Sequence, residues 1–442
     1  MRLSTVLPDG SRFPQGGVLH GLMTDRFPGY HERRARDKKP VAMLADVSKF
    51  LACGDIKVSN ATFDCFDCSF RRIIPLSCKC RSFCEACSVR RQQDRSTFLR
   101  HQVLGDTPVR LWTTTYPYPF RAWLGGDPQM ITAVLGATMR RITRYIRLQI
   151  KHAHGLPTVN IVHPGAVTTI QRTATDLDAN LHFHSLFTDG AFVHHGDDRE
   201  PTFLELPPPT DDDLADIAWD IARGVRKELW RMNCWEDQPD EGERIISGLL
   251  VRRDNQAQPC RFTGVAANAP TRPDGVGAIN LDVTSAIGRG DHQSLLRMLD
   301  YMLAPAIRDK QLTVQRDSVV LELKRPRTDG TTHRRYKFDQ ILDRMAFLVP
   351  PRGANLLRFH GVYAPNAKLR GDVVPDDPAP EEQPPRIDDE NTPEDYRAWA
   401  ELKTHSYPAD VMHCPKCGGR MKLIALNTAR FRYRRKPRKP EN

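Results

Sequence analysis

Two closely spaced cysteine pairs constrain the fold of this chain more than any other feature of its sequence. Cys65-Phe-Asp-Cys68 and Cys84-Glu-Ala-Cys87 are C-x2-C knuckles. Each holds two thiolates at the spacing that a tetrahedral zinc ion requires, and together they predict a closed four-sulfur site. Because four thiolates leave no open position on the metal, we expect this zinc ion to stabilise a small module rather than to take part in catalysis.

The remaining N-terminal cysteines leave a second zinc site open. Cys53 with Cys78 or Cys80 can supply it, completed by a histidine such as His101. The chain has 11 cysteines. In a reducing compartment, close pairs of cysteines indicate metal ligation rather than disulfide bonds. Structural zinc is therefore expected on Cys53, Cys65, Cys68, Cys78, Cys84 and Cys87.

A lone knuckle, Cys414-Pro-Lys-Cys417, lies near the C-terminus. Two thiolates do not fill the shell of a zinc ion, so this pair needs further ligands. His405, His413 or cysteines from elsewhere in the chain can supply them. Two free thiols are the alternative interpretation.

The charge of the chain indicates a polyanionic partner. Its formal net charge is +11, and each phosphate that a basic side chain neutralises releases counterions. A basic protein without such a partner is the alternative. The first ten residues lack the apolar run of a secretory signal, and no stretch of 18 apolar residues follows, so we expect an intracellular protein.

Hydrophobic periodicity predicts an α+β fold, in which helices flank a central antiparallel sheet. Apolar residues recur at every third or fourth position in 129–150, 213–230 and 292–303, and these segments are expected to be helices. Residues 166–173 and 179–189 are two β-rich runs joined by a turn, and they predict a hairpin of the sheet.

Composition divides the chain into five expected segments. They are a basic flexible arm at 1–40, a zinc-binding domain at 41–100, a larger α+β domain at 101–350, a loop with an acidic proline-rich linker at 351–395, and a small cysteine knuckle with a basic tail at 396–442.

The segment Leu181-His182-Phe183-His184 carries candidate metal ligands. Residues two apart on a strand face the same side, so His182 and His184 would present two imidazoles to one spot while Phe183 enters the core. Two imidazoles suit a divalent cation, and an oxygen ligand beside them would leave room for water or phosphate. The alternative is a pair of ordinary surface or core histidines.

Tyr301 is the candidate nucleophile. In the helix expected at 292–303, the leucines and Met302 form an apolar stripe, and Tyr301 lies nearly opposite its centre. A core tyrosine would lie within the stripe, so this ring can face another surface. A ring exposed only to solvent is the alternative, and Tyr336 and Tyr363 are rival candidates.

These features together resemble a known superfamily. Two histidines flanking a hydrophobic residue on a central strand, with a tyrosine on a later helix, are typical of the HUH endonucleases. GAVTTIQR before LHFHSLFTDG, Tyr301 followed by Pro305-Ala306, RFHGVYAPNAKLR and the CPKCGGRMKLIAL ending further resemble rolling-circle insertion-sequence transposases. The resemblance is to the single-tyrosine, common-region type with an N-terminal transposase zinc-binding domain, and it covers about 41–426.

The chain departs from this family pattern in three places. Relatives with two tyrosines carry the second one where this chain has Arg297, which implies a single nucleophile here. Ala304 stands where the family has an arginine before the proline, which implies a weaker phosphate contact. The basic tail is not a family feature.

The resemblance implies a DNA transposase that cuts and rejoins single-stranded DNA at element ends and target sites. Residues 101–350 would be its catalytic domain, with Tyr301 forming a 5′-phosphotyrosine. Mg²⁺ or Mn²⁺ on His182 and His184, with Gln171 as a third ligand from the neighbouring strand, would polarise the scissile phosphate. Such a protein is expected to be cytoplasmic and nucleoid-associated, in a bacterium.

The same resemblance extends to contacts with DNA. These are expected from Arg90, Arg91, Arg297, Arg358 and Lys368. His360 and Lys368 lie in the family-like stretch, where contact with the DNA or the active site is one interpretation and a structural role is the other.

Two other classes of protein are open. A zinc-dependent DNA-binding regulator without enzymatic activity would explain the charge and the knuckles, and a Tyr301 buried far from His182 would favour it. A zinc hydrolase or deaminase is disfavoured, because the chain has neither H-E-x-x-H nor H-x-E with P-C-x-x-C.

Overall fold

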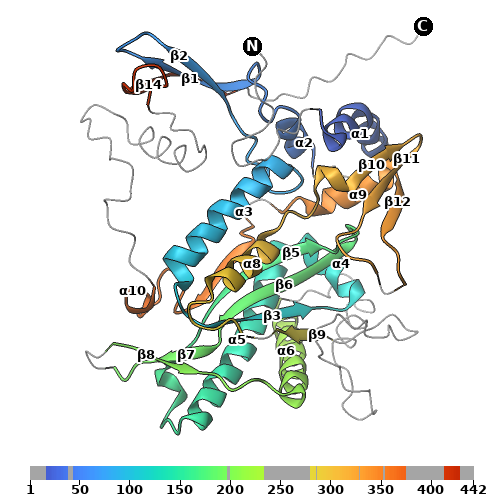
Figure 1. Ribbon diagram of the computed structural model, residues 1–442. Helices are drawn as coiled ribbons and strands as arrows, with labels where there is room; N and C mark the ends of the chain where they lie inside the picture. The colour runs from blue at the N-terminus through green and yellow to red at the C-terminus, as the bar shows by residue number, and fades with distance from the viewer. Residues whose placement is uncertain are drawn as a thin grey trace. The chain divides into compact units, whose positions relative to one another are not determined.

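The computed structural model describes residues 16–37, 43–196, 200–232, 279–284, 286–327, 329–351, 354–374 and 413–428. The chain forms two compact units. Unit 1 comprises residues 1–94, 304–349 and 381–442, and unit 2 comprises 95–303 and 350–380. Both contain helices and antiparallel strands (Figure 1), which confirms the predicted α+β class. Residues 304–349, expected within the 101–350 domain, belong to unit 1.

Unit 2 is built on a five-stranded antiparallel sheet with the order β13-β5-β6-β3-β9 (Figure 1). The strands are β3 (Val109–Thr115), β5 (Gly165–Thr173), β6 (Ala179–Thr188), β9 (Asn280–Val283) and β13 (Leu357–Gly361). β5 and β6 form the predicted hairpin. β6 is the central strand, and its residues are buried from Leu181 onward, which explains why apolar residues occupy both of its faces.

Helices cover both faces of this sheet. α5 (Pro128–Ala153) and α6 (Asp211–Arg231) share the larger core on one face, and α8 (His292–Leu303) packs on the other face. All three helices were predicted from their periodicity and are confirmed. α6 begins at a capping box, in which the Thr210 hydroxyl accepts from the Asp213 backbone and the Asp213 carboxylate accepts from the Thr210 backbone.

The remaining elements of unit 2 are short. The proline-containing segment after β3 continues as helix α4 (Tyr118–Gly126). A second sheet has the order β4-β7-β8. Its strands are β4 (Val162–His163), β7 (Gly190–Val193) and β8 (Thr202–Glu205). The last short helix of the unit is α10 (Arg370–Val373). The long helix α3 (Glu85–Leu99) begins in unit 1 and ends in unit 2.

Unit 1 joins segments from the beginning, middle and end of the chain. One three-stranded sheet has the order β14-β1-β2 and another the order β10-β11-β12. The elements are α1 (Val18–Arg36), α2 (Leu44–Leu51), β1 (Ser59–Cys65), β2 (Arg71–Pro75), β10 (Leu312–Gln315), β11 (Ser318–Glu322), β12 (His333–Lys337), α9 (Phe338–Leu348) and β14 (Met421–Thr428).

Within the segment 1–40, expected to be a basic flexible arm, residues Val18–Arg36 form helix α1. Its apolar side chains are buried, and its basic end bonds to α9 of the same unit. Arg33 donates to Asp339 at 2.5 and 3.0 Å, while Tyr30 and Arg34 donate to Asp343 at 2.7 and 2.6 Å. Arg33 and Arg34 therefore pair with carboxylates of the same unit.

No helix within the described ranges has the length and hydropathy needed to cross a membrane.

Candidate active site

His182 and His184 lie on the central strand β6, on the face that α8 covers. Phe183 between them enters the core on the opposite face, as the alternation of a strand requires. Both histidines are buried, with 9% and 3% of their surface exposed. Their Nε2 atoms are 3.1 Å apart, so the two imidazoles converge on one spot as predicted.

Hydrogen bonds to the other ring nitrogens orient both imidazoles. His182 Nδ1 donates to the Asn180 carbonyl at 2.6 Å, and because a carbonyl can only accept, His182 Nε2 carries a lone pair. His184 Nδ1 lies 3.1 Å from the hydroxyl of Thr113 on β3. Metal-binding histidines are commonly held through their second nitrogen in this manner.

The spacing of the two Nε2 atoms fits a single divalent cation. Two nitrogens bound at about 2.1 Å and at a right angle lie roughly 3.0 Å apart, close to the observed separation. Burial lowers the pKa of His182 to about 4 and that of His184 to about 3, so both rings are neutral at pH 7. Among the described residues, no third His, Cys, Asp or Glu joins this pair as a ligand. An oxygen ligand would have to come from another residue type or from water.

Tyr301 lies beside the histidines. Its ring stands edge-on against that of His184, with centroids 5.3 Å apart and planes at 80°. The apolar stripe of α8 is buried, whereas 47% of the Tyr301 surface is exposed. The rivals Tyr336 and Tyr363 are 4% and 0% exposed. Of the three candidates, Tyr301 therefore combines access for a substrate with contact to the histidine pair.

Gln171 links the strand beside the histidines to the helix that carries the tyrosine. It stands opposite His182 in the β5–β6 register, so its side chain shares the histidine face. Its Nε2 donates to the backbone carbonyl of Met302 at 3.1 Å. The amide therefore anchors the last turn of α8 next to Tyr301, and its role as a metal ligand stays a prediction.

Two charged residues of this region were missed by sequence reasoning. Asp282 on β9 stands opposite Thr113, which in turn stands opposite His184, so its carboxylate shares the histidine face; burial raises its pKa. Arg121 on α4 is close enough to His182 for its charge to contribute to the lowered pKa of that ring, after burial. Neither residue lies in one of the motifs that indicated the site.

The residues expected to contact DNA fall into different environments. Arg297 and Lys368 are exposed in unit 2. Arg358 Nη2 lies 3.5 Å from Thr132 Oγ1 on α5, so this arginine is on the sheet face opposite the histidines. Roles in DNA binding stay predictions for all three.

The two arginines of α3 lie in unit 1, next to the cysteines. Arg91 donates to the carbonyls of Lys79 and Cys80 at 3.1 and 3.2 Å, and Arg90 is half-buried. Arg91 therefore stabilises the loop of the cysteine module, and DNA binding by either arginine stays a prediction.

Residues of the family-like stretch RFHGVYAPNAKLR after α8 have packing roles. Gly361 has φ +60°, and a Cβ there would lie 1.9 Å from the Pro164 carbonyl oxygen, so glycine is required. Val362 and Tyr363 are buried in the core that α8 covers. His360 Nε2 is buried and has no hydrogen-bond partner among the described residues, so both interpretations of this histidine stay predictions.

The structure corrects the predicted grouping of the cysteines. The knuckles at Cys65 and Cys84 do not share one site. Two four-sulfur clusters form instead, and in each the sulfur atoms lie within 4.8 Å of one another. The buried cluster consists of Cys53, Cys78, Cys84 and Cys87, and the bridging cluster consists of Cys65, Cys68, Cys414 and Cys417.

The other candidates for zinc ligation lie outside these clusters. Cys80 Sγ is 2.9 Å from Ser82 Oγ, and neither His101 nor His413 belongs to a cluster. His405 lies outside the described residues. Of the ligands considered for the C-terminal knuckle, cysteines from elsewhere in the chain are the ones that meet it.

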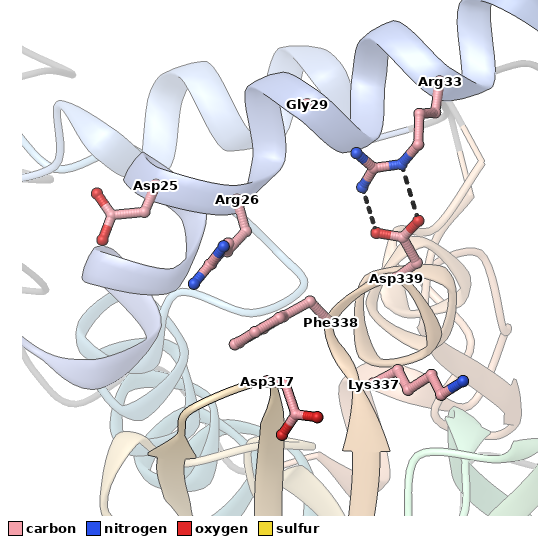
Figure 2. Close-up of a pocket in the computed structure, with 8 residues that line it drawn as sticks. All are labelled: Asp25, Arg26, Gly29, Arg33, Asp317, Lys337, Phe338 and Asp339. Atoms are coloured by element: carbon pink, nitrogen blue, oxygen red, sulfur yellow. Dashed lines mark hydrogen bonds and ion pairs between the residues drawn. The ribbon is translucent and has the colours of Figure 1, made fainter.

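A pocket of about 460 Å³ lies in unit 1, between α1 and the β12–α9 segment (Figure 2). Three basic and three acidic side chains line it. Arg33 is paired with Asp339, and the guanidinium of Arg26 lies 4.4 Å from the ring centroid of Phe338. Because the charges balance, the pocket lacks the excess positive charge that would favour a phosphate group.

Two family models match the chain, one over the histidine–tyrosine site and one over the N-terminal cysteine module. Residues 165–370 match the model described as "Putative transposase", and residues 23–116 match the model described as "Transposase zinc-binding domain". These matches indicate a DNA transposase. The first match includes His182, His184 and Tyr301, and the second includes every cysteine of the buried cluster. No curated protein and no solved structure matches the transposase.

The cysteine clusters fit the expected structural zinc. Four thiolates around one point are the donor set of a closed, tetrahedral structural zinc site. The matched zinc-binding family and the cysteine clusters thus agree on structural zinc in the transposase.

Proposed function

We propose that this transposase cuts and rejoins single-stranded DNA through Tyr301, with a Mg²⁺ or Mn²⁺ ion held by His182 and His184, in rolling-circle-type transposition. One observation carries the proposal: an accessible phenol lies edge-on to His184, whose Nε2 converges with that of His182. A regulator that only binds DNA assigns no role to this contact.

The covalent step balances with these groups. The phenol oxygen of Tyr301 attacks the scissile phosphorus in line, forming a phosphotyrosine bond to the 5′ side and breaking the bond to the 3′ oxygen. The phenol loses its proton, and the departing oxygen gains one to become a 3′-hydroxyl. Attack by a 3′-hydroxyl on the phosphotyrosine reverses the reaction, so the covalent bond conserves the energy for rejoining.

The residues around the tyrosine support this chemistry. A divalent cation at the histidines would stabilise negative charge on the non-bridging phosphate oxygens. Gln171 holds the last turn of α8 and so positions the phenol. Arg121 adds a fixed positive charge near His182, which favours binding of a phosphodiester.

A covalent-trapping experiment tests the proposal. Wild type, Tyr301→Phe and the control Tyr336→Phe are incubated with Mn²⁺ and labelled single-stranded DNA from the sequences that flank the gene. Both phenylalanine variants lack one hydroxyl group, but only Tyr301 touches the histidine site. We expect a denaturant-resistant protein–DNA band in wild type and in Tyr336→Phe, and none in Tyr301→Phe. A band of equal strength in Tyr301→Phe would place the nucleophile elsewhere.

A further inference from the structure

The bridging cluster brings together two knuckles from opposite ends of the chain. Cys65 Sγ is 3.6 Å from Cys417 Sγ, and Cys68 Sγ is 3.5 Å from Cys414 Sγ. Sulfur atoms bound at about 2.3 Å to one tetrahedral zinc ion lie roughly 3.8 Å apart. The four sulfurs therefore have the spacing of a metal shell, and the matched zinc-binding family ends well before the C-terminal pair.

The backbone around the cluster forms two tight turns. In the C-terminal knuckle, the Cys414 N–H donates to the Gly419 carbonyl at 2.7 Å, and the Gly419 N–H donates to Cys417 Sγ at 3.4 Å. A Cβ at Gly419 would lie 1.9 Å from Asp67 Oδ2 of the facing knuckle. A larger residue at 419 would require the Asp67 carboxylate to move, so the two knuckles face each other closely at this point.

The two knuckles are also joined by a strand pair. β14 runs antiparallel to β1 from Cys65 opposite Met421 to Ser59 opposite Thr428 (Figure 1). The core beneath this sheet is small, and two of its buried residues are cluster cysteines. The buried residues of this core are Ala61, Phe63, Cys65, Ile74, Cys414 and Met421. So little apolar burial does not stabilise a three-stranded sheet by itself, and a metal ion is the usual supplement.

The two clusters differ in their exposure. Three cysteines of the buried cluster are buried and Cys78 is half-buried, whereas Cys68 and Cys417 of the bridging cluster are exposed. A chelator or an oxidant therefore reaches the bridging cluster first.

We propose that Cys65, Cys68, Cys414 and Cys417 bind a second structural zinc ion, which clamps the C-terminal strand β14 onto the N-terminal zinc-binding module and exchanges faster than the ion of the buried cluster. Soft thiolates in a tetrahedral arrangement select Zn²⁺ over Mg²⁺ or Mn²⁺. The proposal does not depend on Tyr301 chemistry, because its readouts are metal content and local protection.

Zinc content of the full-length protein tests the site. We expect two zinc ions per chain in wild type and in the control Cys80→Ser, whose sulfur lies outside both clusters, and one in the double variant Cys414→Ser/Cys417→Ser. With a metallochromic chelator, wild type should release zinc in a fast and a slow phase of equal amplitude, and the double variant should lack the fast phase.

Hydrogen exchange then tests the clamp. Amides of β14 should lose protection when the fast zinc is removed, while those of the buried-cluster module keep theirs. One zinc ion per chain in wild type, two in the double variant, or a disulfide in place of the metal would each overturn the proposal. Because none of these measurements uses DNA, a failure of the phosphotyrosine mechanism would leave the result unchanged.

Discussion

The ring of Tyr301 stands edge-on against the ring of His184, 5.3 Å between centroids, although one lies on helix α8 and the other on strand β6. The contact requires that α8 bury its apolar stripe against the sheet, so that Tyr301 in its last turn lies beside the histidine pair. The sheet, the helix and the histidine pair thus depend on one another, and substitutions at each should have distinguishable effects.

Removal of either imidazole should abolish cation binding at this site. In His182→Ala and His184→Ala, one nitrogen ligand is lost, and we expect DNA cleavage to fall by about 100-fold or more. Mn²⁺ binding, followed by electron paramagnetic resonance, should decrease in parallel. His195→Ala, at an exposed histidine outside the site, is the control. Unchanged Mn²⁺ binding in both site variants would contradict the assignment.

Two substitutions at Gln171 separate anchoring from metal ligation. Gln171→Glu keeps a side-chain oxygen but loses the N–H donor to the Met302 carbonyl, whereas Gln171→Leu loses both. If the oxygen is a ligand, Mn²⁺ affinity should survive in the glutamate variant and fall in the leucine variant. Cleavage should fall roughly tenfold or more in both, because the helix end loses its anchor. Equal Mn²⁺ affinity in wild type and both variants would leave Gln171 an anchor only.

Arg121 and Arg358 should differ in their effect on DNA binding. Arg121→Ala removes a positive charge near His182, so we expect weaker binding of single-stranded DNA and a salt dependence reduced by about one unit of slope. Arg358→Ala removes the same charge from the opposite sheet face, so it should weaken the binding of single-stranded DNA less than Arg121→Ala does. Fluorescence anisotropy at several salt concentrations measures both. The reverse ranking would indicate that DNA follows the α5 face.

His360 predicts how stability depends on pH. Burial lowers its pKa from 6.5 to about 4, so the unfolded chain takes up a proton at a pH where the folded chain does not. The free energy of unfolding should therefore fall as pH drops from about 6.5 to about 4. Titration of His360 should account for about 2 kcal/mol of the loss between pH 7 and 5. His182 and His184 act in the same direction.

Denaturant unfolding of wild type and His360→Gln at pH 7 and 5 isolates that share. The variant should lose less stability than wild type on acidification. An identical loss in the two proteins would show that this imidazole does not titrate differently in the folded and unfolded states.

Much of the site could be predicted from local sequence because its determinants are local. Strand alternation places His182 and His184 on one face whatever else the chain does. Helical periodicity places Tyr301 off the apolar stripe of α8 in the same way. The helices α5, α6 and α8 and the β5–β6 hairpin follow from repeats within about 25 residues.

Tertiary structure alone decided which distant segments meet. A C-x2-C spacing sets the bite of one knuckle but not its partner, so Cys65 and Cys68 pair with Cys414 and Cys417 rather than with the nearer knuckle at Cys84. Likewise, β9 brings Asp282 to the histidine face only through its register with β3. The entropy cost of closing a loop grows only slowly with the separation of its ends. Packing in the folded protein, rather than proximity in sequence, therefore selects the partners.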